Sequence, residues 1–299
     1  MTKQLVWLVT GCSSGFGVDF IKAVLERGDK AIATARNFDS LKPLIEAGAA
    51  SLQLDVSASA TEIRGKIDEA VAIYGRIDVL VENAGYAQYG PVEEIPEALV
   101  LKQFQTNVLG NIHLIQAIMP HWRSQQSGFL VVNSSEDSAW HTFPGFSAYS
   151  ASKAALDRFI VLFKAETANL GYIKTLTIHP GPFRTDVANA SKHQFKNPDR
   201  ARPDKPTNYQ WLNDFFVGLI PDFDRKQIGD PTKLAKVVVD MVRDEGSAKG
   251  KTLPSNMPFG VEAVKLAREH AQNLLRVCDE WEGVVGEAVD FKGGQESKK

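Results

Sequence analysis

Tyr149 and Lys153 are two residues whose types and spacing could carry proton chemistry. Residues four apart on a helix lie on the same face, and the apolar stretch that follows them, residues 154–163, predicts a long buried helix. A nearby ammonium group favours the phenolate and lowers the pKa of a phenol, which is about 10 when unperturbed. An isolated Tyr-x-x-x-Lys is usually an exposed tyrosine with a solvated lysine. Whether this pair is a surface pair or a proton donor with its cation therefore depends on the motifs in the rest of the chain.

Strand and helix patterns alternate along the chain around this pair. Apolar runs predict strands at residues 5–10, 30–35, 51–56, 77–81, 129–133 and 174–178, with a weak last strand at 251–256. Helical periodicity predicts helices at residues 18–27, 40–47, 59–74, 97–119, 149–171, 231–243 and 261–281. This alternation predicts an α/β protein, a doubly wound parallel Rossmann sheet of about seven strands flanked by helices.

The carboxyl ends of the predicted strands carry residues that could form a site. Ligands of doubly wound sheets bind at these ends, near the point where the strand order reverses. The residues that fall there are Thr10, Arg36, Asp55, Asn83, Ser135 and Pro180. Their shared placement indicates one site at this edge of the sheet.

A glycine-rich loop joins the first predicted strand to the first predicted helix. Glycines at such a turn allow the backbone to approach a pyrophosphate closely, and the N-terminus of the helix then holds the phosphates. A glycine loop is a specific signal only in this strand–loop–helix context. The cofactor-binding residues predicted here are Gly11, Ser13, Ser14, Gly15, Phe16 and Gly17.

The glycine spacing G-x-x-x-G-x-G, with Tyr-x-x-x-Lys downstream, resembles the short-chain dehydrogenase/reductase family, and the resemblance covers nearly the whole chain. It implies that Asp55 and Val56 lie near the adenine of a dinucleotide. It also implies that a loop over the nicotinamide makes a backbone contact at Phe183 and offers the hydroxyl of Thr185. The matching segments are Asp55-Val56, Asn83-Ala84-Gly85 (preceded by Glu82, where the family usually has Asn) and Pro180-Gly181-Pro182-Phe183-Arg184-Thr185.

The resemblance also assigns catalytic roles. Tyr149 would donate a proton to a substrate carbonyl or remove one from an alcohol, and Lys153 would hold the nicotinamide ribose and lower the pKa of Tyr149. Ser135 would hydrogen-bond the carbonyl oxygen, and Asn107 would hold a water that links Lys153 to solvent. The segment from Ser135 to Tyr149 is about one residue longer than the common pattern, so Ser138, and less so Ser134, are alternatives to Ser135. No metal site is predicted.

Arg36 bears on the choice of cofactor. NAD-specific members of the family usually have a carboxylate at the end of the second strand, whereas a guanidinium there can pair with a 2′-phosphate. NADP is therefore favoured over NAD, with a solvated strand-end arginine as the alternative interpretation.

The bulk properties narrow the remaining possibilities. With a formal net charge of −2 the chain of 299 residues gives no electrostatic reason to expect nucleic acid as a partner. No apolar run is long enough to span a bilayer. Two distant cysteines and no secretory signal indicate the cytoplasm. Residues 1–291 are expected to form one domain, and 292–299 a disordered tail.

Two regions of the sequence suggest where the substrate binds and how subunits assemble. Residues 186–230, rich in Pro, Asn, Asp and aromatics, are expected to form a lid over a substrate pocket, with a packing subdomain or an oligomer surface as the alternative. The helices at 97–119 and 150–170 are where the family commonly pairs subunits, so a homodimer or homotetramer is expected. The residues near the chain end, Asp279-Glu-Trp281-Glu282 with Asp290-Phe291, resemble a subgroup of longer bacterial and fungal reductases.

The leading hypothesis is an NADP(H)-dependent oxidoreductase that interconverts a carbonyl and a secondary alcohol on a fairly apolar small molecule. One alternative is a nucleotide-binding regulator without turnover, although such a sensor has no need of the proton donor Tyr149. Another is an enzyme of the same fold that assists an epimerisation or a cyclisation.

Overall fold

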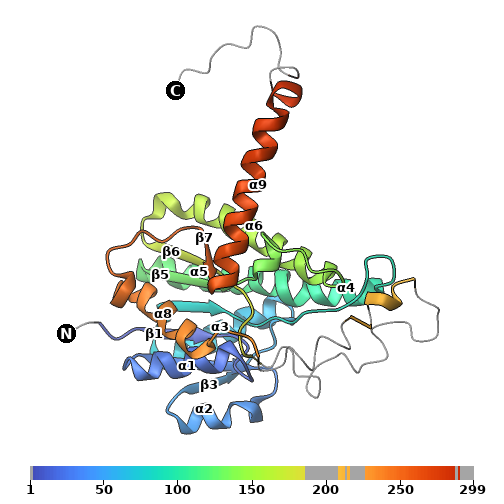
Figure 1. Cartoon of the computed structure of the whole chain (residues 1–299). Coiled ribbons are helices and arrows are strands. Elements are labelled where there is room, and N and C mark those ends of the chain that lie inside the picture. The colour runs from blue at the N-terminus through green and yellow to red at the C-terminus, as the bar shows by residue number, and fades with distance from the viewer. Residues whose placement is uncertain (1–2, 186–207, 213, 216–225, 287–288, 290–299) are drawn as a thin grey trace.

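A seven-stranded parallel sheet forms the centre of the computed structural model (Figure 1), which describes residues 3–185, 208–212, 214–215, 226–286 and 289. The strand order is β3-β2-β1-β4-β5-β6-β7, and every neighbouring pair is parallel. The order therefore reverses between β1 and β4, as the predicted doubly wound fold requires. The strands are β1 Val6–Val9, β2 Lys30–Ala35, β3 Ala50–Gln53, β4 Val79–Glu82, β5 Gly128–Asn133, β6 Ile173–Pro180 and β7 Asn256–Phe259.

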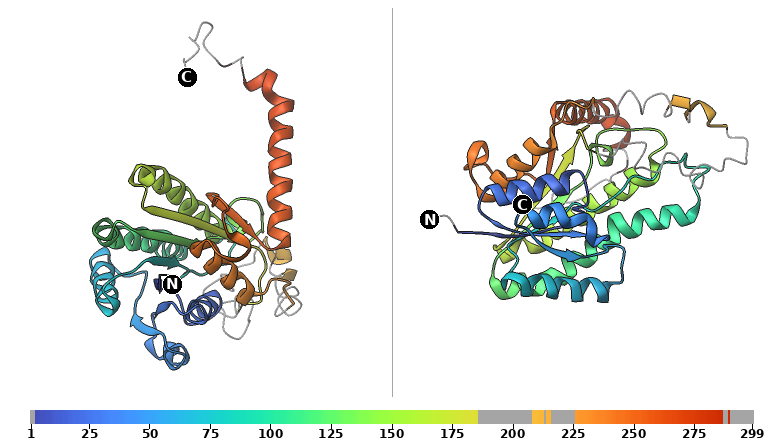
Figure 2. Two further views of the ribbon diagram at one scale, coloured as in Figure 1. Left: turned by 90° about the vertical axis from the view of Figure 1, so that its left-hand side faces the viewer. Right: turned by 90° about the horizontal axis from the view of Figure 1, so that it is seen from below.

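Helices cover both faces of this sheet (Figure 2). One core lies under α1, α2 and α8, and the other under α3, α5 and α6. Along β1 the side chains alternate between them, with Trp7 and Val9 in the first core and Val6 and Leu8 in the second. The helices are α1 Phe16–Glu26, α2 Lys42–Glu46, α3 Ala60–Tyr74, α4 Glu97–Phe104, α5 Gly110–Gln125, α6 Ser147–Thr167, α8 Pro231–Arg243 and α9 Val261–Val285.

Several element boundaries differ from the predicted ones. The last strand is Asn256–Phe259 rather than 251–256, because Met257 and Phe259 pack on the first core while Lys251 is exposed. The third strand ends at Gln53, because the Asp55 carboxylate accepts hydrogen bonds from the N–H and the hydroxyl of Ser57 and so forms a turn.

The long helix predicted at 97–119 is interrupted. A five-residue π-helix, Gln105–Leu109, separates α4 from α5. It carries Asn107, and such segments are frequent at functional sites. The helix that carries Tyr149 begins two residues before it, at Ser147.

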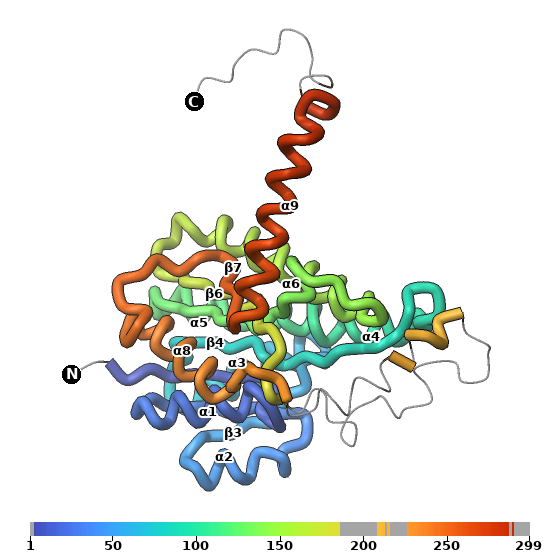
Figure 3. Tube along the Cα trace, in the orientation of Figure 1, coloured from blue at the N-terminus to red at the C-terminus, as the bar shows by residue number. Residues whose placement is uncertain are grey.

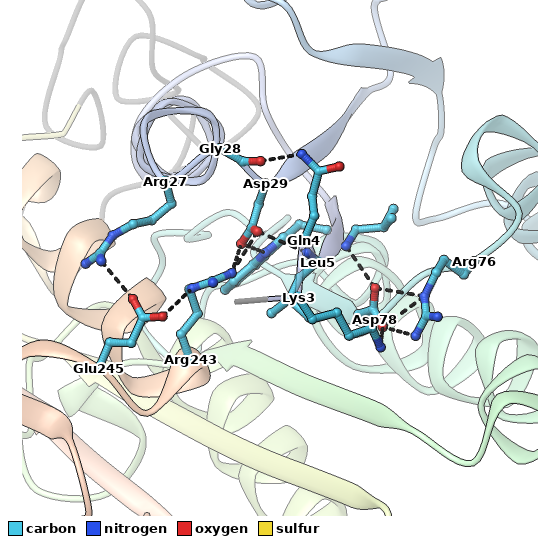
Figure 4. Close-up of polar contacts among 12 residues, drawn as sticks. Lys3, Gln4, Leu5, Arg27, Gly28, Asp29, Arg76, Asp78, Arg243 and Glu245 are labelled. Atoms are coloured by element: carbon cyan, nitrogen blue, oxygen red, sulfur yellow. Dashed lines mark hydrogen bonds and ion pairs between the residues drawn. The ribbon is translucent and has the colours of Figure 1, made fainter. Parts of the chain in front are cut away.

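Asp29 is a buried carboxylate just before β2, at the edge of the sheet opposite the strand carboxyl ends (Figure 4). It accepts hydrogen bonds from the backbone N–H of Leu5 and the indole N–H of Trp7, each at 3.0 Å. Both of its oxygens accept from a guanidinium nitrogen of Arg243, at 2.7 and 2.8 Å, and so join the end of α8 to the sheet. The ion pair is structural, since it lies far from the strand ends that bind ligands.

Asp78 is a second buried carboxylate, and it joins β1 to the start of β4. Its carboxylate accepts the backbone N–H of Val6 at 2.9 Å and pairs with Arg76 and Lys3. The amino edge of the sheet is thus held by two buried carboxylates, which leaves the carboxyl edge to the site.

Two predictions lie wholly or largely outside the described residues: most of the lid at 186–230 and all of the tail at 292–299. In the described part, Leu212 and Tyr209 pack with Tyr89, Phe143 and Phe146. None of the helices in the described ranges has the length and hydropathy that a bilayer crossing requires.

Candidate active site

Tyr149 and Lys153 lie on α6 next to the carboxyl end of β5. Lys153 is buried, and its Nζ donates a hydrogen bond to the backbone oxygen of Asn133 at 2.6 Å. Asn133 is the last residue of β5, so the helix and the strand end are joined at this point. Tyr149 is half-buried, and its ring contacts Phe146 edge-on at 6.3 Å between ring centroids.

Ser135 follows β5 by two residues and faces Tyr149. Its hydroxyl lies close enough to the phenol of Tyr149 to lower the pKa of that phenol. The hydroxyl oxygen accepts the backbone N–H of Asp137 at 3.2 Å. The serine is 7% exposed, so its position is well defined. The predicted partners therefore meet, although they come from different elements.

The electrostatics of the chain by itself favour a protonated Tyr149. Burial raises the pKa of the phenol above its ordinary value, the Ser135 hydrogen bond opposes this, and three carboxylates (Asp137, Asp157 and Glu136) raise it further. The lowering of the Tyr149 pKa by Lys153, which the family resemblance implies, stays a prediction. Burial lowers the pKa of Lys153 itself to about 8.

Ser138 is placed differently from Ser135. Its hydroxyl donates to the carboxylate of Asp157, and it lies 3.2 Å from Nδ1 of the fully buried His179. A hydroxyl has one proton to donate, and two acceptors lie near that of Ser138, the Asp157 carboxylate and the Ser135 backbone oxygen at 2.6 Å. Of the two serines, Ser135 is thus the one that contacts Tyr149.

Asn107 connects the π-helix to the loop after β4 and to α6. Its side-chain oxygen accepts the backbone N–H of Tyr86 at 3.2 Å, and its amide donates to the Tyr86 oxygen and to the Ser152 hydroxyl. A Cβ at Gly85 would lie 3.2 Å from the Asn107 side-chain oxygen and 3.5 Å from the Lys153 Nζ. A Cβ at position 85 would therefore require the Asn107 side chain to shift by a few tenths of an ångström.

The loop after β4 also holds the glycine-rich loop in place. The Asn83 amide donates to the backbone oxygens of Thr10 and Gly11, and its oxygen accepts from Asn133 at 3.0 Å. The Thr10 hydroxyl accepts the backbone N–H groups of Asn83 and Ala84. Asn83, which the sequence places at the ligand edge of the sheet, thus contacts the glycine-rich loop.

The glycine-rich loop turns tightly and approaches the loop after β4 closely. Gly11 has a φ of 71°, and a Cβ there would lie 2.8 Å from the Cα of Ala84. A Cβ on Gly17 would collide with the Gly11 oxygen. The N-cap of α1 is Gly15, which has no side chain to accept the first N–H groups of the helix. These N–H groups are suited to an anion such as a pyrophosphate. Ser13 and Ser14 are exposed beside them, and Phe16 is half-buried.

Arg36 and Asp55 lie exposed beyond the ends of β2 and β3. These strands are neighbours, and the Gln53 amide donates to the Arg36 oxygen at 2.8 Å. No carboxylate among the described residues pairs with the Arg36 guanidinium. Val56, in contrast, is buried in the second core.

The segment after β6 closes the other side of the glycine-rich loop. Phe183 packs against Phe16 at 5.4 Å between ring centroids, and a Cβ on Gly15 would lie 3.6 Å from the Cβ of Thr185. Pro180 ends β6, and a Cβ on Gly181 would meet a carboxylate oxygen of Glu136. The segment that contains Pro180, Gly181, Phe183 and Thr185 therefore lies between the loop after β5 and the glycine-rich loop.

A model of the family described as short chain dehydrogenase matches residues 5–196. The chain belongs to this family. The short-chain dehydrogenase is 31% identical over 285 residues to oxidoreductase BOA17 of Botryotinia fuckeliana, covering 94% of this chain and 97% of that protein. It is also similar to a short-chain dehydrogenase from Streptomyces avermitilis, with 33% identity, a TM-score of 0.78 and coverage of 97% and 100% of the two chains.

A second solved structure shares the fold at lower identity. It is a short chain dehydrogenase/reductase from Burkholderia phymatum in complex with NAD, 20% identical, with a TM-score of 0.76 and coverage of 92% of this chain and 96% of that one. The likeness supports the doubly wound fold.

A cavity of about 420 Å³ in this short-chain dehydrogenase adjoins the catalytic candidates, since Asp137 and Ser150 line it. His141 lies on its wall, and its Nδ1 is 2.7 Å from a carboxylate oxygen of Asp137. That hydrogen bond raises the pKa of His141. The sequence indicated His141 as a residue of the site only through its position between Ser135 and Tyr149. The other lining residues are mostly apolar: Pro91, Val92, Thr142, Phe143, Pro144, Gly145, Ser147, Tyr209, Trp211 and Leu212.

Glu82 stands where the family usually has Asn, and the structure shows its surroundings. It ends β4, is 2% exposed, and neither carboxylate oxygen has a hydrogen-bond partner in the described chain. Burial raises its pKa well above the ordinary value, and the charge of Lys153 opposes the shift. Glu82 is therefore a buried carboxyl group near Lys153 whose neutral form is favoured by burial.

Proposed function

We propose that this short-chain dehydrogenase is an NADP(H)-dependent oxidoreductase that interconverts a carbonyl and a secondary alcohol on a fairly apolar small molecule. The observation that carries the proposal is that the Ser135 hydroxyl lies close enough to the phenol of Tyr149 to shift its pKa, beside an apolar cavity. A protonated phenol and a hydroxyl that meet beside such a cavity can both bind one carbonyl oxygen.

The glycine-rich loop and Arg36 support the choice of cofactor. The N–H groups at the start of α1 would bind the pyrophosphate, and the Arg36 guanidinium, unpaired within the described residues, would bind a 2′-phosphate. Lys153 and the segment from Pro180 to Thr185 would hold the nicotinamide end. The cofactor, when bound, supplies the hydride.

In reduction, Tyr149 gives its proton to the carbonyl oxygen as the carbonyl carbon gains the hydride. The electron pair of the C=O π bond moves to the oxygen, which takes the phenolic proton and becomes the alcohol hydroxyl. Ser135 donates a hydrogen bond to the same oxygen and stabilises its developing charge. Lys153, with a pKa of about 8, carries a proton at neutral pH and stabilises the phenolate that remains. Oxidation runs through the same residues in reverse.

The cavity supports a mostly apolar substrate with one polar contact. Phe143, Trp211 and Leu212 offer apolar surface, while His141 and Asp137 form a hydrogen-bonded polar pair on the wall. A ketone or aldehyde on an apolar skeleton matches this lining.

We further propose that the protein acts in the cytoplasm as a homodimer or homotetramer. Exposed apolar side chains on the helices where pairing was predicted support the assembly: Leu101 on α4, and Phe159 and Leu162 on α6.

A panel of apolar ketones and aldehydes assayed with the purified full chain tests this function. Loss of reduced-cofactor absorbance is expected to be faster with NADPH than with NADH. Tight NADPH binding without turnover of any carbonyl would favour the regulator instead. A rearranged product without net cofactor oxidation would favour epimerisation or cyclisation.

A further inference from the structure

Helix α9 projects from the body of the protein (Figures 1 and 3). Its first residues follow β7 and contact the sheet, while the rest extends away from it. Of its 25 residues only Ala263, near the start, is buried. Helices in proteins gain most of their stability from packing of an apolar face, and no described residue packs over the outer part of this one.

This helix nevertheless has an apolar face with a regular period. Apolar residues recur at alternating spacings of three and four, the pattern of the a and d positions of a coiled coil. Leu274, Trp281 and Val285 are 55%, 48% and 57% exposed. The positions of this seam are Val264, Ala267, Ala271, Leu274, Cys278, Trp281 and Val285.

We propose that α9 pairs with α9 of a second copy of this chain as an antiparallel two-helix coiled coil. The partner is the same segment because the seam is complementary to itself in one antiparallel register. In that register Trp281 lies opposite Ala271 of the partner, and Val285 lies opposite Ala267. The layer between them pairs Leu274 with Cys278.

The sizes of these side chains favour the antiparallel arrangement. Each large residue meets a small one, so the layers fill at the density that packed cores require. A parallel pair in register would place Trp281 against Trp281, and would place alanine against alanine at positions 267 and 271. Such layers are overfilled at one point and leave voids at another.

Charges beside the seam favour the same register. Arg268 and Glu282 occupy equivalent flanking positions, and the antiparallel pair brings Arg268 of each copy next to Glu282 of the other. Both are exposed, and neither has an ion-pair partner among the described residues, unlike Lys265–Glu269 and Arg276–Glu280, which pair within the helix. The two-fold symmetry produces the contact twice.

The outer half of α9 does not have the composition of a membrane-binding helix. Such helices carry lysine and arginine on the polar face and bind anionic lipids. Here Asp279, Glu280 and Glu282 outnumber Arg276. The contact is also separate from the helices α4, α5 and α6, where the family resemblance predicts subunit pairing, so the two contacts can coexist.

The particle mass of the full chain, measured by light scattering after size-exclusion chromatography, tests the pairing. Leu274→Asp is expected to halve the mass relative to wild type. Ile73→Asp, which charges an exposed apolar side chain on α3, is the matched control and is expected to keep the wild-type mass. Helical circular dichroism checks that each variant is folded. An unchanged mass for folded Leu274→Asp would overturn the proposal.

A charge exchange tests the register. Arg268→Glu and Glu282→Arg, each alone, place like charges together and are expected to shift the assembly towards half the mass at low protein concentration. The double variant restores opposite charges and is expected to recover the wild-type mass. Failure of the double variant to recover would rule out the antiparallel register. Cross-linking of wild type through Cys278 under oxidation would rule it out as well, because only a parallel pair brings the two Cys278 thiols together.

Discussion

The Nζ of Lys153 lies 2.6 Å from the backbone oxygen of Asn133, the residue that ends β5. This contact fixes α6 against the strand whose next residues include Ser135. Because Tyr149 lies one helical turn before Lys153, the same contact sets the position of the phenol relative to the serine hydroxyl. The geometry of the candidate site therefore depends on one helix and one strand end that are joined by a buried lysine.

Glu82→Gln is expected to change how stability depends on pH. An unfolded glutamate ionises with a pKa of about 4.3, whereas burial raises the pKa of Glu82 in the folded chain. Wild type therefore loses stability as pH rises above about 4, and glutamine, which cannot ionise, does not. Lys153, with its pKa lowered to about 8, acts in the opposite direction only above pH 8.

Urea unfolding of wild type and Glu82→Gln at pH 5 and pH 7 measures this effect. The variant is expected to gain stability relative to wild type between the two pH values. A difference that stays constant with pH would show that Glu82 is ionised in the folded protein.

The two serines are expected to respond differently to alanine substitution. Ser135→Ala should lower kcat by about 10²–10³-fold, the usual loss for one donor to a developing oxyanion. Ser138→Ala should leave kcat within a few-fold and cost about 1–3 kcal/mol of stability, because it removes a hydrogen-bond donor from the buried Asp157 carboxylate. Steady-state kinetics and urea unfolding of both variants check this. The reverse pattern would make Ser138 the catalytic serine.

Arg36→Ala is expected to weaken NADPH binding selectively. A hydrogen bond to a charged group contributes about 1.5–3 kcal/mol, which corresponds to roughly a 10–100-fold higher Kd. Binding of NADH, which lacks the 2′-phosphate, should be unchanged. Fluorescence titration with both cofactors measures this, with Arg64→Ala on the exposed surface of α3 as the control. Equal losses for both cofactors would argue against 2′-phosphate recognition by Arg36.

Asp29→Ala is expected to reduce stability without affecting cofactor binding. It leaves the buried Arg243 guanidinium without its bidentate partner, and breaking a buried pair typically costs about 3–5 kcal/mol. Asp68→Ala, which removes an exposed partner of His121, should change the unfolding free energy by less than about 1 kcal/mol. Urea unfolding gives both values. A loss of NADPH affinity in folded Asp29→Ala would mean that this edge of the sheet influences the site.

The features that the sequence predicted best are those with a local signal. The parallel sheet follows from apolar runs alternating with helical periods, and the loop at Gly11–Gly17 follows from residues adjacent in the chain. The last strand was misplaced because Met257 and Phe259 are recognised as core residues only once α8 and β6 are in position. The π-helix at Asn107 has no signal of its own, since its neighbours Gln105 and Thr106 suit an ordinary helix.

Features that depend on contacts between distant residues could not be predicted. Ser135 was preferred over Ser138 from its strand-end position alone. That Ser135 lies near Tyr149, whereas Ser138 contacts Asp157, appears only in three dimensions. The burial of Glu82 needed the packing of α5 and α6 over β4. The exposure of α9 was also not predictable, because its apolar period is equally typical of a helix packed on the body.

Tyr149→Phe, measured for turnover and for NADPH binding in the same preparation, tests the account's central claim most directly. The substitution removes only the hydroxyl that is proposed to transfer the proton, and general acid catalysis typically contributes about 10²–10⁴-fold. The expected result is a fall in kcat of at least that size with NADPH affinity within a few-fold of wild type. Turnover at the wild-type rate would contradict the proposed role of Tyr149 and, with it, the mechanism.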